Sequence, residues 1–263
     1  MENKKELLLR AKDISIVFGG LRAVSDFNLE LYEGELIGLI GPNGAGKTTV
    51  FNMLSGVYKP TEGTITFVDR NGSQQVASGK TPAELNRMGI ARTFQNIRLF
   101  SNLTVAENIK IALHQVRGVS PIDVLFRTKK FRADEVAMQT KTEHLLSLFH
   151  MEGKINEIAK NLPYGEQRKL EICRALASGP KLLLLDEPAA GMNEQETHEL
   201  MEMIAFIRKE FNLTVLLIEH DMKLVMGICE RLLVLNYGRV IAEGKPEEIR
   251  SNEEVVKAYL GNN

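Results

Sequence analysis

The stretch GPNGAGKTT, residues 41–49, decides how the rest of the chain is interpreted. It matches the pattern G-x-x-x-x-G-K-[ST], with the apolar run LIGLI before it and the helix-like segment TTVFNMLSG after it. Small residues let the backbone wrap around phosphates so that successive N–H groups point inward, and the following helix adds the positive end of its dipole. A glycine-rich turn that binds no ligand could match the same sequence pattern, but the flanking strand and helix favour a nucleotide site.

Single residues of this loop have distinct expected roles. Lys47 supplies a mobile charge between the outer phosphates, and Thr48 offers its hydroxyl to Mg²⁺. The residues expected to bind the nucleotide are Gly41, Asn43, Gly44, Ala45, Gly46, Lys47, Thr48 and Thr49.

Two acids follow a buried strand in KLLLLDEP, residues 181–188. A carboxylate beside a buried strand needs a cation or a bound water. Because successive strand residues face opposite ways, we expect Asp186 to hold Mg²⁺ through its water shell and Glu187 to polarise the attacking water. Pro188 restricts the residue before it, so we expect an extended backbone at Glu187. An acidic loop without a role is the alternative, and the phosphate loop makes it the weaker one.

Two further polar residues are candidates for the same site. His220 ends the apolar run TVLLIEH, and ligands of open parallel sheets bind at the carboxyl edge of the strands, where an imidazole could donate to the γ-phosphate. Gln95, in RTFQN, lies where β character gives way to helical character, and its amide could touch both Mg²⁺ and the attacking water. From the sequence alone, a structural role is equally open for His220 and is favoured for Gln95.

The order of apolar patterns predicts an α/β fold. The first third contains short alternating stretches broken by glycine pairs, which are typical of β structure. From Thr104 to Lys160 the pattern is helical, and Thr104 and Glu107 form a capping-box signal. Apolar residues then follow at helical spacing: Ile109, Leu113 and Val116.

The last hundred residues alternate between short apolar strands and helices. They include a hairpin around Asn236-Tyr237-Gly238 and a final helix that ends near Leu260. Strands alternating with helices indicate a mostly parallel sheet that is covered on both faces.

Composition and charge exclude several classes of protein. The net charge of the 263 residues is −1, so no global charge argues for nucleic acid or acidic lipid. Cys173 and Cys229 lie in apolar helical contexts without metal-ligand spacing, so we expect buried free thiols in a reducing compartment. The N-terminus lacks the apolar core of a signal peptide, and no apolar run approaches the roughly 20 residues of a membrane helix. We therefore expect the chain not to span a bilayer by itself.

The motifs, taken in order, resemble those of the ATP-binding cassette (ABC) ATPases over almost the whole chain: GPNGAGKTT, Gln95, LPYGEQR at 162–168, LLLLDEP and His220. The resemblance implies one ABC ATPase domain over residues 1–263. Its fold would be a P-loop NTPase core with a mostly parallel sheet, an N-terminal antiparallel β subdomain and a helical subdomain inserted at about 97–162. ATP and Mg²⁺ would be its cofactors, and ATP hydrolysis its activity.

The same resemblance assigns the segment LPYGEQR, hereafter the signature segment, to the start of a helix that contacts the γ-phosphate bound on an opposite subunit. Tyr164, Gly165 and Glu166 would make this contact in trans, so two nucleotides would be sandwiched between two such domains. Phe18 would stack on the adenine, although a core aromatic is equally open for it.

Longer stretches, RTFQNIRLFSNLTVAENI and the ending GKPEEIRSNEEVVKAYLG among them, look like ATPase subunits of branched-chain amino-acid importers. Relatives that serve urea, short amides or lipopolysaccharide look similar. The resemblance implies a peripheral subunit at the cytoplasmic face of the inner membrane. Its partners would be membrane-spanning permease subunits, a second ABC ATPase subunit in a homodimer or heterodimer and, indirectly, an external solute-binding protein, without nucleic acid.

Two other classes of protein fit less well. A soluble cassette protein of DNA repair or translation usually carries a tandem cassette, a long coiled coil or a zinc module, and none is seen in this sequence. A GTPase or small-molecule kinase would share the phosphate loop, but the sequence has no N-K-x-D motif and the signature segment would have no task.

Four residues depart from the broad family pattern. Pro163 replaces a serine, Tyr164 a glycine, Glu166 a glutamine and Asn193 an aspartate. Similar changes occur in the importer subgroup, so they do not indicate inactivation. The trans contact is then expected to depend on the Gly165 N–H and the helix dipole.

A basic stretch at 117–132 also stands out, with Arg117, Arg127, Lys129, Lys130 and Arg132 among apolar residues. It could lie near lipid headgroups, or it could be a solvated loop. The absence of a clean helical period favours the solvated loop.

Overall fold

The computed structural model describes residues 5–114, 123, 126 and 128–260. The chain divides into two compact units, each with more contacts within itself than to the other. Unit 1 comprises residues 1–95 and 181–263, and unit 2 comprises residues 96–180. The predicted helical insertion, about 97–162, falls within unit 2, which continues through the helix behind the signature segment.

Unit 1 contains a four-stranded antiparallel sheet in the order β2-β1-β4-β5. Its strands are β1 (Leu7–Phe18), β2 (Leu21–Tyr32), β4 (Glu62–Val68) and β5 (Gln74–Val76). The turn between β1 and β2 uses Gly19 and Gly20, both at positive φ. This sheet confirms the predicted N-terminal antiparallel β structure.

The second sheet of unit 1 has six strands in the order β10-β9-β3-β8-β7-β6, and all neighbours are parallel except β9 and β10. Its strands are β3 (Leu36–Ile40), β6 (Ile90–Arg92), β7 (Leu182–Asp186), β8 (Thr214–Ile218), β9 (Arg231–Asn236) and β10 (Arg239–Gly244). Every residue of β3, β7 and β8 is buried, as expected for central strands covered on both faces. The predicted mostly parallel sheet is confirmed.

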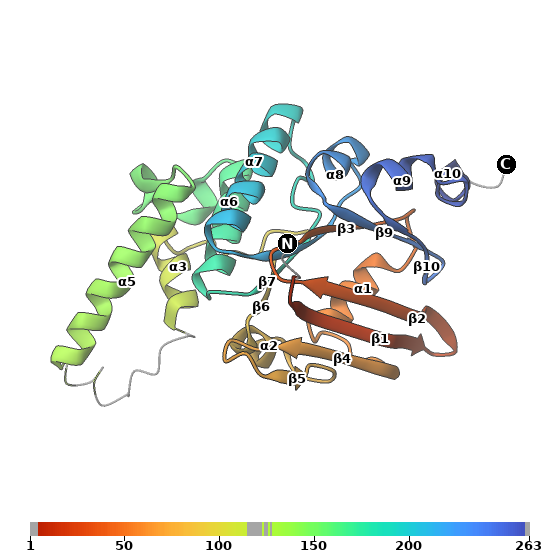
Figure 1. Ribbon diagram of the computed structural model, residues 1–263. Coiled ribbons are helices and arrows are strands. Elements are labelled where there is room, and N and C mark those ends of the chain that lie inside the picture. Colours follow the sequence, from red (N-terminus) through yellow and green to blue (C-terminus); the bar gives the residue numbers. More distant parts are fainter. Residues whose placement is uncertain (1–4, 115–122, 124–125, 127, 261–263) are drawn as a thin grey trace. The chain divides into compact units, whose positions relative to one another are not determined.

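Helices cover both faces of this sheet (Figure 1). The helices of unit 1 are α1 (Lys47–Leu54), α2 (Pro82–Met88), α7 (Glu194–Glu210), α8 (Met222–Ile228), α9 (Pro246–Ser251) and α10 (Glu253–Leu260). Helix α1 contacts β2 of one sheet and β7 of the other, so one hydrophobic core extends through both sheets. A Cβ added to Gly38 on β3 would lie 2.9 Å from Val225 of α8, which places α8 against the sheet.

Unit 2 is helical. Its α-helices are α3 (Val105–His114), α5 (Lys129–Leu148) and α6 (Tyr164–Ala177), with short 3₁₀ turns at η1 (Glu152–Lys154) and η2 (Ala159–Asn161). The capping box is confirmed, because the Thr104 hydroxyl accepts from the Glu107 N–H at 3.2 Å while the Glu107 carboxylate accepts from the Thr104 N–H at 2.7 Å. Val116 lies outside the described residues.

The basic stretch at 117–132 is only partly described. Lys129, Lys130 and Arg132 belong to the first turn of α5, whose N-terminus is capped by the Thr128 side chain. Arg117 and Arg127 lie outside the described residues.

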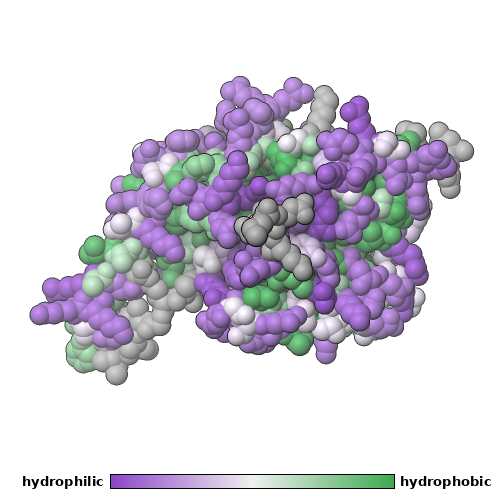
Figure 2. Space-filling model, viewed as in Figure 1, coloured by the Kyte–Doolittle hydropathy of each residue, from purple (hydrophilic) through white to green (hydrophobic). Residues whose placement is uncertain are grey.

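Within the described ranges, no helix combines the length and the apolar character that crossing a membrane requires. On the face shown in Figure 2, hydrophilic residues cover most of the surface and hydrophobic ones form small separate patches. Cys173 and Cys229 are buried and free, as predicted, and burial raises the pKa of both thiols.

Candidate functional site

The phosphate loop joins β3 to α1 and is backed by the β9–β10 hairpin of unit 1. A Cβ at Gly41 would lie 2.0 Å from the Leu235 carbonyl oxygen, so only glycine fits there. Gly46 caps α1 with φ at 103°, in the left-handed region. The Gly238 N–H donates to the Ala45 carbonyl oxygen at 2.9 Å, which ties the hairpin to the loop. The glycines therefore allow a tight loop whose shape is set by a distant hairpin.

The side chain of Lys47 lies over this loop. Its Nζ donates to the carbonyl oxygens of Gly41 at 2.6 Å and Pro42 at 2.9 Å. Burial lowers the pKa of Lys47, and the nearby carboxylates of Glu187 and Asp186 oppose this by raising it. The ammonium is thus held over the loop close to the two predicted acids, while Thr48 beside it is exposed.

Asp186 ends β7 and is almost fully buried. Its Oδ2 accepts from Nη2 of Arg92 at 2.7 Å, and the two side chains are only 5% and 6% exposed. Arg92 ends β6, the neighbouring parallel strand. The sequence interpretation missed Arg92, although its position directly before TFQ at a strand end could have drawn attention to it.

Glu187 meets the two other predicted catalytic residues. Its Oε2 accepts from Nε2 of Gln95 at 2.7 Å, and its Oε1 lies 2.7 Å from Nε2 of His220. Asp186 and Glu187 therefore have different partners despite being adjacent. Three side chains that come from positions 95, 187 and 220 converge at the carboxyl edge of the parallel sheet.

The expected extended backbone at Glu187 is wrong. Its φ is 47°, in the left-handed region, which costs roughly 1–3 kcal/mol for a residue other than glycine. Pro188 disfavours the right-handed helical conformation before it but does not impose an extended one. A turn follows at once, since the Ala190 N–H donates to the Glu187 carbonyl oxygen at 3.1 Å, and Glu187 itself donates to Ile218 on β8 at 2.9 Å. The carboxylate is aimed by this tight turn.

Glu219 is a second buried acid at the carboxyl edge of the parallel sheet, and the sequence interpretation missed it. Glu219 is 5% exposed and accepts from the Ala189 N–H at 2.8 Å and the His220 N–H at 3.1 Å. Burial raises the pKa of Glu219, and the two N–H groups oppose this. Glu219 therefore fastens the turn after Glu187 to the backbone that carries His220.

Phe18 is not a core aromatic. Its ring is 42% exposed and meets the ring of Tyr58 edge to face, with centroids 5.2 Å apart. An exposed aromatic face of this kind can stack on a flat ligand such as a nucleobase.

The predicted magnesium ligands are a hydroxyl, an amide and one carboxylate: Thr48, Gln95 and Asp186. Mg²⁺ usually takes one or two protein carboxylates and completes its shell with waters and phosphate oxygens. Among the described residues no group of three or more His, Cys, Asp or Glu side chains forms a metal cage. This donor set fits a metal that is held mainly by a nucleotide.

The signature segment lies in unit 2, where Pro163 precedes the first turn of α6. The Tyr164 ring is 45% exposed. The carboxylate of Glu166 is paired with Lys154 at 2.5 Å, and this hydrogen bond raises the pKa of Lys154.

The last residue of the signature segment, Arg168, belongs to a buried pair that the sequence interpretation also missed. Arg168 donates to Oε2 of Glu171 at 2.7 Å, and both side chains are at most 2% exposed. Oε1 of Glu171 accepts from the Arg98 N–H at 3.0 Å. The pair could have been predicted from the sequence, because an arginine and a glutamate three residues apart on a helix lie on the same face.

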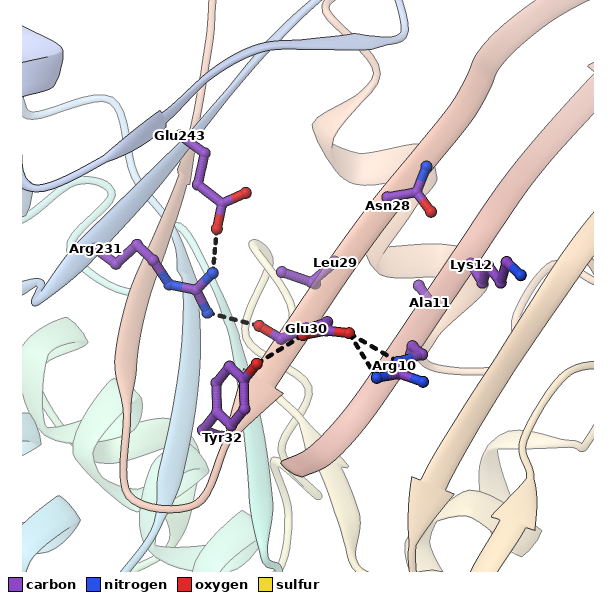
Figure 3. Close-up of a pocket in the computed structure, with 9 residues that line it drawn as sticks. All are labelled: Arg10, Ala11, Lys12, Asn28, Leu29, Glu30, Tyr32, Arg231 and Glu243. Atoms are coloured by element: carbon purple, nitrogen blue, oxygen red, sulfur yellow. Dashed lines mark hydrogen bonds and ion pairs between the residues drawn. The ribbon is translucent and has the colours of Figure 1, made fainter. Parts of the chain in front are cut away.

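A separate hollow of about 530 Å³ is lined by residues of β1, β2, β9 and β10 in unit 1 (Figure 3). Most of its charged side chains bind one another: Glu30 pairs with Arg10 at 2.8 Å and accepts from the Tyr32 hydroxyl at 2.6 Å, while Arg231 pairs with Glu243. None of the predicted site residues lines this hollow. Most of these charges are matched within the hollow, and the phosphate loop lies elsewhere in unit 1.

Comparison with known families gives two matches. The family described as ABC transporter matches residues 24–190, and the family described as branched-chain amino acid ATP-binding cassette transporter matches residues 239–263.

Individual relatives are similar over nearly the full chain. The branched-chain amino acid transport ATP-binding protein LivG of Escherichia coli strain K12 is 48% identical over 97% of this chain and 98% of its own. BraF of Pseudomonas aeruginosa, named for the same transport, is 45% identical over the same shares. A solved ATP-binding cassette of an ABC transporter, in its ADP conformation, is 30% identical with a TM-score of 0.82, covering 97% of this chain and 99% of that one.

Proposed function

The chain belongs to the ABC transporter family and is an ATPase, and from this premise we propose that it drives an importer of branched-chain amino acids. The proposal is supported by the identity of 48% to LivG and of 45% to BraF, and by the short C-terminal family match. Related systems for urea, amides or lipopolysaccharide are the alternatives.

ABC transporter ATPases work with membrane permease subunits, and we propose the finer arrangement for this chain. It would lie at the cytoplasmic face of the inner membrane, pair with a second ABC ATPase subunit and receive cargo indirectly from an external solute-binding protein. The whole chain would form one ABC ATPase domain, with the helical subdomain of about 97–162 inserted. Tyr164, Gly165 and Glu166 would contact the γ-phosphate held by the other subunit, and Phe18 would stack on the adenine.

In the proposed mechanism the phosphate loop holds ATP, with Lys47 and backbone N–H groups at the phosphates. Thr48, Gln95 and Asp186 would hold Mg²⁺, which neutralises charge on the phosphates when bound. Glu187 is the proposed base for the attacking water, and His220 would donate to the γ-phosphate. The observation that carries these roles is the position of the Glu187 carboxylate, held at 2.7 Å by Gln95 on one oxygen and by His220 on the other.

The base assignment is tested with Glu187→Gln. We expect ATP binding to persist while hydrolysis falls by about 100-fold or more, because general-base catalysis typically contributes this much. Glu202→Gln, on the exposed face of α7, is a matched control that should hydrolyse ATP normally. Turnover of Glu187→Gln at the control rate would refute the assignment.

Cargo is tested in membranes. The chain should co-purify with polytopic proteins, and vesicles that contain this complex and its external binding protein should show ATPase activity stimulated by leucine, isoleucine or valine. Stimulation by urea or an amide instead would reassign the transporter without changing the ATPase mechanism.

A further inference from the structure

Arg92, the first residue of the stretch RTFQN, lies at the centre of a small buried network in unit 1 and has so far been given no role in the site. It ends β6 and reaches the end of β7, where its Nη2 donates to Oδ2 of Asp186. The two residues are 94 positions apart in the chain, and both side chains are nearly buried. A buried pair of this kind is retained only when its geometry is good, since taking both charges out of water is costly.

The guanidinium is fixed on its other side by α1, the helix that follows the phosphate loop. Its Nη1 donates to Oδ1 of Asn52 at 2.7 Å and to Oγ of Ser55 at 2.8 Å. The guanidinium carbon also lies 5.7 Å from the ring centroid of Phe51 and 4.9 Å from that of Phe94. These distances allow cation–π attraction, so the planar cation is held by hydrogen bonds and by rings.

This arrangement controls which part of Asp186 is available. Among the described residues, the recorded hydrogen bond of the Asp186 side chain goes to Oδ2 and comes from Arg92 alone. Oδ2 is therefore anchored, and rotation of the carboxylate is restricted. Oδ1 remains for the waters of a metal shell. Partners that orient a metal ligand are worth about 10- to 100-fold in metal affinity when they are removed.

We infer that Arg92 is a positioning residue of the magnesium site, which orients the Asp186 carboxylate and links it to α1 and to the segment that carries Gln95. This inference rests on the proposed role of Asp186. Arg92 would act through Asp186 rather than on the nucleotide or the metal itself. Phe94, which packs on the guanidinium, directly precedes Gln95, so the same cation also stabilises the backbone from which Gln95 reaches Glu187.

The test compares Arg92→Gln and Arg92→Lys with the unchanged chain. ATP affinity is measured by calorimetry once in EDTA and once in saturating Mg²⁺, and the Mg²⁺ concentration for half-maximal hydrolysis is measured separately. For Arg92→Gln we expect unchanged ATP affinity in EDTA, but a half-maximal Mg²⁺ concentration raised by about 10-fold or more. Arg92→Lys keeps the charge but not the planar fork, so its half-maximal Mg²⁺ concentration should lie between those of Arg92→Gln and the unchanged chain.

Controls separate positioning from general stability. Arg231→Gln breaks the ion pairs of a part-buried arginine elsewhere in unit 1, and it should leave Mg²⁺ dependence unchanged. If Arg92→Gln does not fold, Arg92→Lys decides the question. A folded Arg92 variant with normal Mg²⁺ dependence overturns the inference, and so does an equal loss of ATP affinity in EDTA and in Mg²⁺.

Asp186→Asn shows whether the underlying assignment holds. It should lose most of the gain in ATP affinity that Mg²⁺ provides. If Asp186→Asn responds to Mg²⁺ as the unchanged chain does, the metal role of Asp186 fails, and the inference about Arg92 fails with it. A Mg²⁺ defect in Asp186→Asn without one in Arg92→Gln overturns the inference alone.

Discussion

Two buried arginine–carboxylate pairs, one in each unit, have the same N–O distance of 2.7 Å but are built differently. Arg92 and Asp186 come from neighbouring strands and are 94 residues apart, whereas Arg168 and Glu171 are three apart on helix α6. The first pair borders a loop that we propose binds a nucleotide. The second connects the helix of the signature segment to the Arg98 backbone.

The comparison indicates that an equal N–O distance in two buried pairs does not imply an equal role. Asp186 has one oxygen anchored and lies at the edge of the site, while both oxygens of Glu171 are engaged inside unit 2. Asp186 keeps Oδ1 for a ligand, whereas the carboxylate of Glu171 is 2% exposed and bound on both oxygens to groups of its own unit. We therefore expect changes at Asp186 to alter chemistry and changes at Glu171 to alter stability.

The largest expected effect is on stability, with Glu171→Ala. It removes the carboxylate that balances the buried Arg168 charge and accepts from the Arg98 N–H, so the free energy of unfolding should fall by about 3–5 kcal/mol. Urea unfolding measures it. The control, Glu166→Ala, breaks a pair that is about a third exposed and should cost at most ~1 kcal/mol. Similar losses for both variants would mean that burial does not distinguish the two pairs.

Next is Gly165→Asp, at the start of the helix that Glu171 anchors. The added carboxylate would face a γ-phosphate across the proposed dimer, so cooperative hydrolysis should fall by about 100-fold. ATP binding by the single chain should persist, because the phosphate loop belongs to unit 1. Both are measured as functions of protein concentration. Gly153→Asp, an open position in the same unit, is the control, and unchanged turnover of Gly165→Asp would mean that the segment makes no trans contact.

Glu219 is a third buried acid, and it differs from Asp186 and Glu171 in its partners. In the described chain, its carboxylate accepts hydrogen bonds from the backbone N–H groups of Ala189 and His220 and from no arginine. Burial raises the pKa of Glu219 above its ordinary 4.5. A raised folded pKa stabilises the fold below the ordinary pKa, and this contribution is lost as the pH rises through the folded pKa. The stability of the unchanged chain relative to Glu219→Gln should therefore decline from acid toward neutral pH. A pH-independent difference in urea unfolding would contradict the shift.

The smallest effect is expected at Asn193, which departs from the family pattern. Its side chain accepts from the Glu196 N–H at 2.9 Å, while the Glu196 carboxylate accepts from the Asn193 N–H at 3.0 Å. Asparagine and aspartate cap helices about equally, so Asn193→Asp should change stability by less than ~0.5 kcal/mol. Thermal unfolding measures this, with Asn193→Ala expected to lose about 1 kcal/mol. A large gain from aspartate would show that the capping box is strained.

The sequence predicted the elements of the site better than their contacts. The phosphate loop, the acids after β7 and the histidine after β8 were identified because parallel strands bring their carboxyl ends to one edge. Local patterns do not encode the backbone angle of Glu187, since a proline restricts the preceding residue without choosing among the remaining conformations. The sequence also left open whether Phe18 is buried or exposed, because this depends on the residues that pack around it in the fold.

By itself, the sequence determined the α/β fold, the phosphate loop and the family, because these follow from short-range periodicity and from motifs whose spacing is fixed by backbone geometry. Only the tertiary structure decided that Arg92 anchors Asp186, that Glu219 fastens the turn after Glu187, and that Gln95 and His220 hold one carboxylate between them. Those partners are far apart along the chain and carry no common pattern. Their contacts exist because strand order and burial bring polar groups together that must satisfy one another away from water.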